Sequence, residues 1–254
     1  MKGSEPRNVL KCKASESSHV EDSLAAEGRL NITINGTKVV SLFCTPTMLR
    51  ELAVGFVMSE GIADGVCVER MSLMHQDGEA TVEMHAEGEV NLEGGTVTSG
   101  CVGGMSFGGK EVKSAHEDTL QVKSTALRSA MKRFLLKDGL YTETGCVHRA
   151  ALLDGDEVIA YAEDIGRHNA VDKVIGGAIL DGEDFRGKVL LASGRLSSEI
   201  VSKCAAWGIP IVASRAAPTA RGVSIAEEAG VTLVGFMRGE RYNIYSHPKR
   251  IITS

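Results

Sequence analysis

Cys101 lies in the segment SGCVGGMSFGG, residues 99–109, in which glycine and serine are too dense for a helix or a strand. Glycine removes side-chain bulk and backbone preference, so a thiol in such a loop can approach a partner closely and then move away. This placement favours a carrier of sulfur or of an acyl group. The alternative is an incidental cysteine, because free cysteines usually act as small buried hydrophobes.

A second group of polar residues stands at the start of a predicted helix. Arg167, His168 and Asn169 follow an acidic pair and a glycine in the segment 161–180. His168 and Asp172 are four residues apart and share a helix face, where the carboxylate could orient the imidazole for proton transfer or for holding a ligand. The alternative is a structural role, in which these residues cap the helix and the histidine makes an ordinary hydrogen bond.

Arginines gather at the predicted ends of three strands. Ser193, Gly194 and Arg195 lie between a strand and a helix, where glycine and the free amides of a helix start make an anion site. Further arginines stand in or just after the next two strand-end loops, at Arg215, Arg221, Arg238 and Arg241. The pattern predicts a site for a phosphate-bearing ligand such as a nucleotide. The alternative is a set of solvated surface charges.

The cysteines indicate free thiols rather than disulfides or a metal site. Six cysteines are scattered along 254 residues, and no C-x-x-C or C-x-x-H pair is present. Cys146 and His148 are two residues apart, so they point the same way on a strand, but as a zinc pair they lack partners. We therefore expect no metal and a reducing compartment.

Composition indicates a globular protein with 43% hydrophobic residues, enough for one large domain or two small ones. The net charge of -5 and the pI near 5.8 argue against a broad surface for nucleic acid or for an anionic membrane. No run approaches the roughly 18 apolar residues of a membrane helix, and no signal peptide is recognised. We expect a cytoplasmic protein.

The N-terminal third predicts a small ββαββ unit. Residues 1–28 are expected to be a frayed segment with at most one edge strand. Asn35-Gly36 separates two β-rich runs and predicts a tight hairpin, and residues 71–88 predict another. Between them, Thr47 is predicted to cap a helix over residues 48–58 that Gly61 ends.

The rest of the chain predicts an α/β unit. A helix over residues 124–137 precedes a strand pair near 146–153 and 157–162, followed by a helix over 167–180. Strands at 187–193, 209–214 and 231–237 then alternate with helices over 196–207 and 219–229. Parallel strands joined by right-handed crossovers are the simplest arrangement.

Six segments of the chain carry a resemblance to a known family: TPTMLRELAVGFVMSEGI, SGCVGG, TGCVHRAAL, EDIGRHNAVDKVIG, SGRLSSEIVSKCAAWGIPIVASRAAPT and GVTLVGFMRGERYNIY. In this order they closely resemble the formate dehydrogenase accessory sulfurtransferase family, FdhD, from about Arg29 to the C-terminus. The resemblance implies a small α+β domain over residues 29–115 and a three-layer α/β domain like that of cytidine deaminases over 116–254. Deaminase chemistry is excluded, because the chain lacks H-x-E with P-C-x-x-C.

The resemblance implies a dimeric sulfur carrier. It would accept sulfur as a persulfide from a cysteine desulfurase and pass it to the molybdenum cofactor, bis-molybdopterin guanine dinucleotide, before the cofactor enters formate dehydrogenase. GDP or GTP would mimic the guanine end. The runner-up is a non-catalytic chaperone that binds the same cofactor and in which Cys101 carries no sulfur. A redox sensor is a weaker third alternative, because no two cysteines are adjacent in the sequence.

The resemblance also implies roles for particular residues. Cys101 takes the persulfide position. Apart from what the resemblance implies, we expect Cys146, His148 and His168 to be auxiliary residues. The segment that contacts the guanine dinucleotide comprises Phe236, Met237, Arg238, Gly239, Glu240 and Arg241. The remaining cofactor-binding residues are Arg167, Asn169, Ser193, Gly194 and Arg195.

The chain departs from the family pattern at two positions. Gly104 stands where the family usually has a second loop cysteine, so this loop cannot form an internal disulfide. Cys146 stands where the family commonly has glycine. From this coincident loss and gain we hypothesise that Cys146 lies near Cys101 and shares the handling of sulfur.

Overall fold

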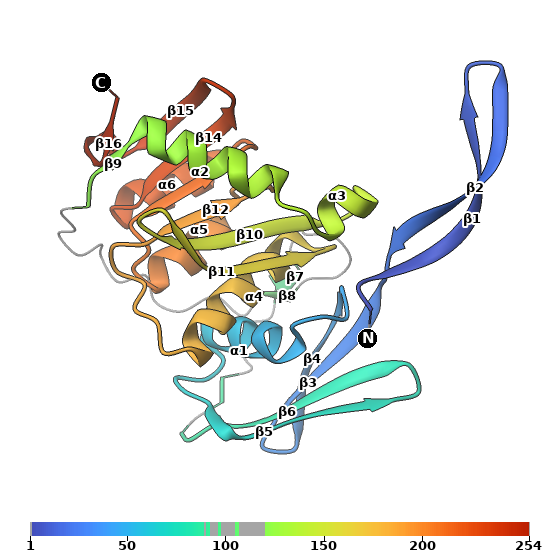
Figure 1. Cartoon of the computed structure of the whole chain (residues 1–254). Helices are drawn as coiled ribbons and strands as arrows, with labels where there is room; N and C mark the ends of the chain where they lie inside the picture. The colour runs from blue at the N-terminus through green and yellow to red at the C-terminus, as the bar shows by residue number, and fades with distance from the viewer. Residues whose placement is uncertain (1, 89, 92–95, 98–104, 107–119, 254) are drawn as a thin grey trace.

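The computed structural model describes residues 2–88, 90–91, 96–97, 105–106 and 120–253, which form a mixed α+β protein (Figure 1). Cys101 and Gly104 lie outside the described residues, as does the predicted domain boundary near residue 115. The division of the chain into the ranges 1–28, 29–115 and 116–254 therefore stays a prediction. Among the described residues, no helix combines the length and the apolar character needed to cross a membrane.

The N-terminal segment forms a two-stranded arm that projects from the rest of the protein (Figure 1). Strands β1 (Ser4–Lys13) and β2 (Glu16–Ala25) pair antiparallel over their whole length. The expectation of a frayed segment with one edge strand was wrong. The alternation of apolar and polar residues that is typical of a strand is hard to recognise here. Val9 and Val20 form the one pair of opposed aliphatic residues in the arm.

The predicted ββαββ unit is confirmed. Strands β3 (Gly28–Ile34), β4 (Thr37–Cys44), β5 (Cys67–Gln76) and β6 (Glu79–His85) form a sheet in the order β4-β3-β6-β5. Asn35 and Gly36 make the predicted tight turn with φ of 51° and 77°. Helix α1 (Leu49–Ser59) packs on one face of this sheet. Thr47 does not cap the helix, because its N-cap is Met48, which has left-handed φ and makes no side-chain capping bond.

A six-stranded sheet forms the centre of the second half. It comprises β10 (His148–Asp154), β11 (Glu157–Asp164), β12 (Val189–Ala192), β13 (Ile211–Ser214), β14 (Thr232–Arg238) and β15 (Arg241–Ser246), in the order β11-β10-β12-β13-β14-β15. The predicted parallel pairing is confirmed for β12, β13 and β14. Strand β15 was missed, and it pairs antiparallel with β14 after a turn at Gly239 and Glu240.

Helices cover both faces of this sheet and make three layers (Figure 1). Helix α2 (Ser124–Leu136) packs on one face, next to the short pair β9 (Val122–Lys123) and β16 (Ile251–Ile252). Helices α4 (Arg167–Leu180), α5 (Ser198–Ala206) and α6 (Ala220–Glu228) pack on the other. The remaining elements are β7 (Thr96–Val97), β8 (Met105–Ser106), helix α3 (Leu140–Thr144) and a 3-10 turn at Pro248–Arg250.

Two glycines let helices α1 and α4 cross at backbone contact. A Cβ on Gly55 would lie 1.9 Å from the carbonyl oxygen of Asp172, and a Cβ on Gly176 would lie 1.9 Å from that of Glu51. Because the obstructing atoms are backbone, no side chain can rotate away to make room. This crossing joins the four-stranded sheet to the layer of helices that carries the functional candidates.

We expect Gly176→Ala to destabilise the fold by about 1–3 kcal/mol or more, because the added methyl group forces α1 and α4 apart. Gly177→Ala is the matched control, since a Cβ there meets only the Glu51 side chain, at 3.9 Å. That variant should gain up to about 1 kcal/mol from helix propensity. Urea unfolding of both variants measures the difference, and equal midpoints would contradict the proposed close contact.

Candidate functional site

The loops that follow β12, β13 and β14 are hydrogen-bonded to one another at the carboxyl edge of the sheet. The Ser214 hydroxyl donates to the Gly194 carbonyl at 2.7 Å, and the Leu196 amide donates to the Ala217 carbonyl at 3.1 Å. The Phe236 amide donates to the Ala216 carbonyl at 3.0 Å. The predicted convergence of these three loops is therefore confirmed.

A basic cluster, defined here as His148, Arg167, His168 and Arg195, gathers where β12 ends. His148 Nδ1 lies 3.3 Å from the Ser193 hydroxyl, at the start of β10. A Cβ on Gly194 would lie 2.8 Å from Arg167 Cβ and 3.3 Å from His148 Nδ1. Glycine at residue 194 thus lets the β12 loop lie directly against two members of the cluster.

Both imidazoles in the cluster are held uncharged. Burial, and after it the nearby charges of Lys203 and Arg167, lower the pKa of His168 from 6.5 to about 3. Burial lowers the pKa of His148 too, with the charges of Arg167 and Arg195 acting in the same direction. At neutral pH the cluster therefore offers two guanidinium groups beside two neutral rings, an arrangement suited to an anionic ligand.

The predicted pairing of His168 with Asp172 was wrong. The Asp172 carboxylate is buried and accepts two hydrogen bonds from Lys203 Nζ, at 2.7 and 2.6 Å. Lys203 also lies 3.0 Å from Glu60, at the end of α1. His168 Nε2 instead lies 3.7 Å from the carboxylate of Glu199, which sequence reasoning had not selected. No contact between Asp172 and the imidazole supports a proton relay.

A second buried charge network fixes the start of α4. Lys173 Nζ lies 2.6 Å from Asp164 Oδ2 and 3.0 Å from the Thr45 carbonyl oxygen, to which it donates. The Thr45 amide donates in turn to Asp164 Oδ2 at 3.0 Å. Asn169 joins the network, since its amide group donates to Asp164 Oδ1 and to the Phe43 carbonyl. The Asn169 amide therefore links the end of β4 to the start of α4.

Helix α3 is held at the edge of the cluster by one carboxylate. Glu163 accepts hydrogen bonds from the Leu140 and Tyr141 amides at 2.8 and 3.0 Å, and from the Arg149 guanidinium at 2.8 Å. The Tyr141 hydroxyl accepts from Arg215 at 2.6 Å. Helix α3 therefore connects the end of β13 to the start of β10.

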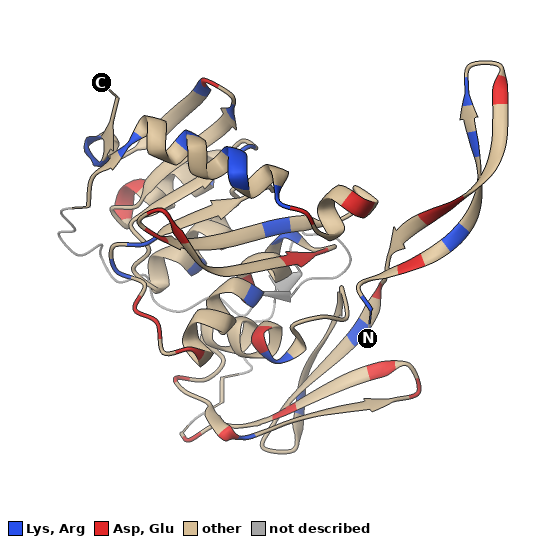
Figure 2. Cartoon of the chain, in the orientation of Figure 1, with Lys and Arg blue, Asp and Glu red and all other residues tan. Residues whose placement is uncertain are grey.

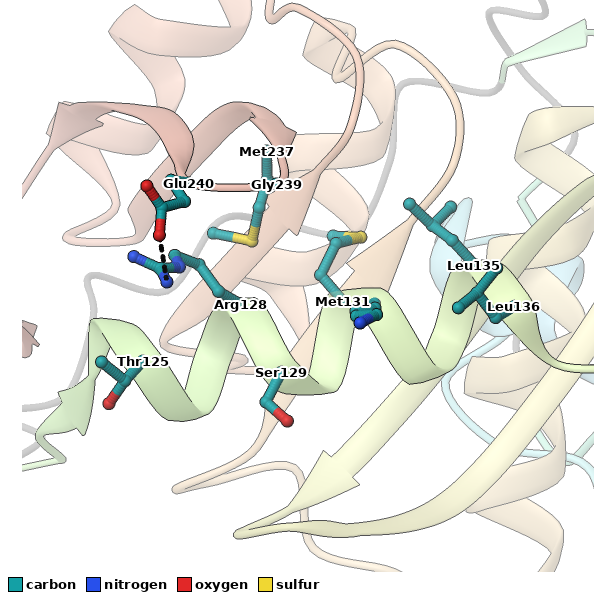
Figure 3. Close-up of a pocket in the computed structure, with 10 residues that line it drawn as sticks. Thr125, Arg128, Ser129, Met131, Leu135, Leu136, Met237, Gly239 and Glu240 are labelled. Carbon is teal, nitrogen blue, oxygen red and sulfur yellow. Dashed lines mark ion pairs between the residues drawn. The ribbon is translucent and has the colours of Figure 1, made fainter.

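The predicted guanine-contact segment occupies a different place from the basic cluster. Met237, Gly239 and Glu240 line a cavity of about 620 Å³ beside α2 (Figure 3). Glu240 lies 3.8 Å from Arg128, and the cavity is otherwise lined by Thr125, Ser129, Met131, Lys132, Leu135 and Leu136. This groove is on the α2 face of the sheet, whereas the cluster adjoins the start of α4 on the other face.

The other residues of that segment lie at the turn itself. Phe236 has a left-handed φ of 53°, and the Arg241 guanidinium lies 5.7 Å from the centre of its ring. The Arg238 guanidinium donates to the Arg215 carbonyl at 3.1 Å. Arg238 therefore ties the β14 turn to the β13 loop.

The described cysteines include two buried thiols, two exposed thiols and the half-buried thiol of Cys67. Burial raises the pKa of Cys44 and of Cys204 to about 12, so neither is a thiolate nucleophile at neutral pH. Cys146 is exposed just before β10, two residues from His148. Cys12, on the arm, is exposed too. Within the described part of the chain, no group of three or more His, Cys, Asp or Glu side chains is placed to hold a metal ion.

The depressed pKa of His168 predicts a loss of stability in acid. Between pH 6.5 and about pH 3 the unfolded chain binds a proton at this residue and the folded chain does not. Stability should therefore fall as pH falls below 6.5, by up to about 1.4 kcal/mol per pH unit from this residue. His168→Gln should remove that part of the slope in urea unfolding followed against pH, with exposed His75→Gln as the control. An unchanged slope in His168→Gln would contradict the burial of a neutral imidazole.

The chain is similar to known proteins of one family. The FdhD/NarQ family model matches residues 25–252. The sulfur carrier protein FdhD of Wolinella succinogenes is 40% identical over 240 residues, which cover 91% of this chain and 83% of that protein. The protein of the same name from Bacillus subtilis is 36% identical over 96% of each chain. A crystal structure from Desulfotalea psychrophila, described as a formate dehydrogenase accessory protein, superposes with a TM-score of 0.79 at 25% identity, over 99% of this chain and 100% of that one.

Proposed function

The chain belongs to the FdhD/NarQ family, and from this membership we propose that it is a sulfur carrier for formate dehydrogenase. In this proposal Cys101 receives a persulfide from a cysteine desulfurase. The sulfur then passes to the molybdenum cofactor, bis-molybdopterin guanine dinucleotide, before the cofactor enters formate dehydrogenase. The protein acts as a homodimer in the cytoplasm, and its six-stranded unit shares the three-layer architecture of the cytidine deaminase fold.

The observation that carries the proposal is the basic cluster at the end of β12. Arg167 and Arg195 provide positive charge, while the lowered pKa values keep His148 and His168 neutral. A molybdopterin dinucleotide carries phosphates and sulfur ligands with negative charge, and guanidinium groups bind such anions in paired hydrogen bonds. The groove beside α2, with Met237 and Glu240, is a separate candidate for the guanine end.

Loading of Cys101 is a thiol–persulfide exchange. The Cys101 thiolate attacks the outer sulfur of the donor persulfide, the sulfur–sulfur bond breaks, and the donor leaves as a thiolate. Release of that sulfur as sulfide needs two electrons. In our hypothesis the Cys146 thiolate attacks the inner sulfur, sulfide leaves, and a Cys101–Cys146 disulfide remains, which an external dithiol must reduce before the next cycle.

The loading step predicts a gain of one sulfur atom on Cys101. After incubation with cysteine desulfurase and cysteine, mass spectrometry should find this adduct in the wild-type protein and not in Cys101→Ser. GDP binding, measured by calorimetry on the same samples, should be equal in both. Intact GDP binding without an adduct on wild-type Cys101 would instead favour the non-catalytic cofactor chaperone.

The release step predicts a different defect for Cys146→Ser. In a single turnover without added reductant, this variant should acquire the persulfide normally but release sulfide at least about tenfold more slowly than the wild type, because no second thiol of the chain attacks the inner sulfur. Peptide mapping of the wild type after one turnover should find the Cys101–Cys146 disulfide. Cys12→Ser, which replaces another exposed thiol, is the control. Full persulfide turnover in Cys146→Ser would refute the shared role.

A further inference from the structure

The side chain of Ser193 lies where the start of β10 meets the loop after β12. Ser193 is buried, and its amide donates to the Arg149 carbonyl at 3.0 Å. Its Oγ accepts from the Arg149 amide at 3.0 Å. The same Oγ lies 3.3 Å from Nδ1 of His148. The hydroxyl is therefore in contact with a backbone donor and with an imidazole at the same time.

The start of β10, which carries both of these contacts, is held in place by the side chain of Arg149. Its guanidinium is buried and donates to the Phe134 carbonyl at 2.7 Å and to Glu163 at 2.8 Å. The basic part of β10 and the acidic end of β11 lie side by side in Figure 2. A shift of β10 would break this buried ion pair, which is strongly unfavourable. The Ser193 hydroxyl therefore meets a fixed backbone donor.

The two contacts determine where the hydrogen of the Ser193 hydroxyl points. A hydroxyl has one donor and two acceptor positions, and the Arg149 amide fills one of the acceptor positions. Among the described residues, Nδ1 of His148 is the partner left for the hydroxyl hydrogen. A proton on Nδ1 would direct two donors at the serine oxygen and leave the hydroxyl hydrogen without an acceptor, which is costly for a buried group. The serine therefore donates and Nδ1 accepts.

The imidazole of His148 has one proton to place on its two nitrogens. Burial lowers its pKa, and the charges of Arg167 and Arg195 act in the same direction, so the ring is neutral at neutral pH. In a neutral imidazole, the hydrogen bond made by one nitrogen sets which nitrogen is protonated. The ring is also closely packed, since a Cβ on Gly194 would lie 3.3 Å from Nδ1. An imidazole that accepts at Nδ1 carries its proton on Nε2.

We propose that Ser193 is a positioning residue whose hydroxyl keeps the proton of His148 on Nε2, so that the neutral ring donates a hydrogen bond to an acceptor atom of an anionic ligand. Arg167 and Arg195 attract the ligand by charge, and the Nε2–H group selects an acceptor such as a phosphate oxygen without adding a further charge. The identity of the ligand rests on the proposed function. The position of the proton rests on the contacts of Ser193 alone.

Nuclear magnetic resonance tests the position of the proton directly. A long-range proton–nitrogen spectrum of the isotope-labelled full chain at neutral pH should show an unprotonated Nδ1 and a protonated Nε2 for His148, whose signals are identified by their loss in His148→Gln. In Ser193→Ala, both nitrogen shifts should move towards the average of the two tautomers, because Nδ1 has lost its donor. Ser193→Thr keeps the hydroxyl and should restore the wild-type pattern. A proton on Nδ1 in the wild type would overturn the proposal.

Ser214→Ala is the matched control for the loss of a buried hydroxyl. Ser214 follows the same pattern at the end of β13, since its hydroxyl donates to the Gly194 carbonyl at 2.7 Å and accepts from the Ala216 amide at 3.0 Å. Neither partner is an imidazole, so this variant should leave the nitrogen shifts of His148 unchanged. Equal shifts in Ser193→Ala and Ser214→Ala would overturn the proposal, because they would report a general disturbance of the loops.

GDP binding measures the consequence for a ligand. By calorimetry, the dissociation constant for GDP should rise about three- to tenfold in Ser193→Ala and recover in Ser193→Thr, because a misplaced proton removes one hydrogen bond to the ligand. An unchanged dissociation constant in a Ser193→Ala protein with altered tautomers would overturn the donor role of His148. A wild-type protein that does not bind GDP would contradict the proposed cofactor instead, and the spectrum of the free protein would still decide the role of Ser193.

Discussion

The buried pair of Lys173 and Asp164 is the interaction on which the arrangement of the site depends. Both side chains are fully buried, so each charge has lost its hydration and relies on the other and on the backbone of Thr45. Removing one partner from a buried pair typically costs about 3–5 kcal/mol, because the other charge is left without compensation. The pair spans β4, β11 and α4, so the position of Arg167 and His168 is tied to a strand more than a hundred residues earlier in the chain.

A further buried lysine connects elements in the same way, through buried ion pairs. Lys203 joins α5 to Asp172 on α4 and to Glu60 at the end of α1, next to the glycine crossing of the two helices. Its charge also lowers the pKa of His168. Packing and electrostatics are thus coupled here: the groups that bring three helices together also keep an imidazole neutral at the edge of the sheet.

Sequence patterns predicted the helices, strands and turns that are determined by residues close together in the chain. Asn35-Gly36, the apolar stripe of α4 and the strand–helix alternation after residue 187 all lead to the observed elements. The sequence patterns did not predict interactions between side chains that are distant in the chain. Asp172 was assigned to His168 from helical spacing, but Lys203, 31 residues away, takes its carboxylate. Lys173 could have been noticed, since a lysine within the apolar stripe of α4 needs a buried acid, yet nothing in the sequence indicates that Asp164 and Thr45 supply it.

The separation of the basic cluster from the groove beside α2 also lies beyond sequence reasoning. Arg195 in the cluster and Gly239 in the groove both follow strands with parallel pairing, β12 and β14, which predicts one edge but not which face of the sheet each occupies. The observed placement on two faces means that a ligand in contact with both must extend around the end of β14.

Helix α3 has only five residues, yet it holds the base of the arm and is itself held by the single carboxylate of Glu163. Its Glu143 side chain accepts from Ser4 at the base of the arm, and its Tyr141 hydroxyl accepts from Arg215 at the end of β13. The contact with the arm and the contact with the β13 loop therefore depend on the same carboxylate.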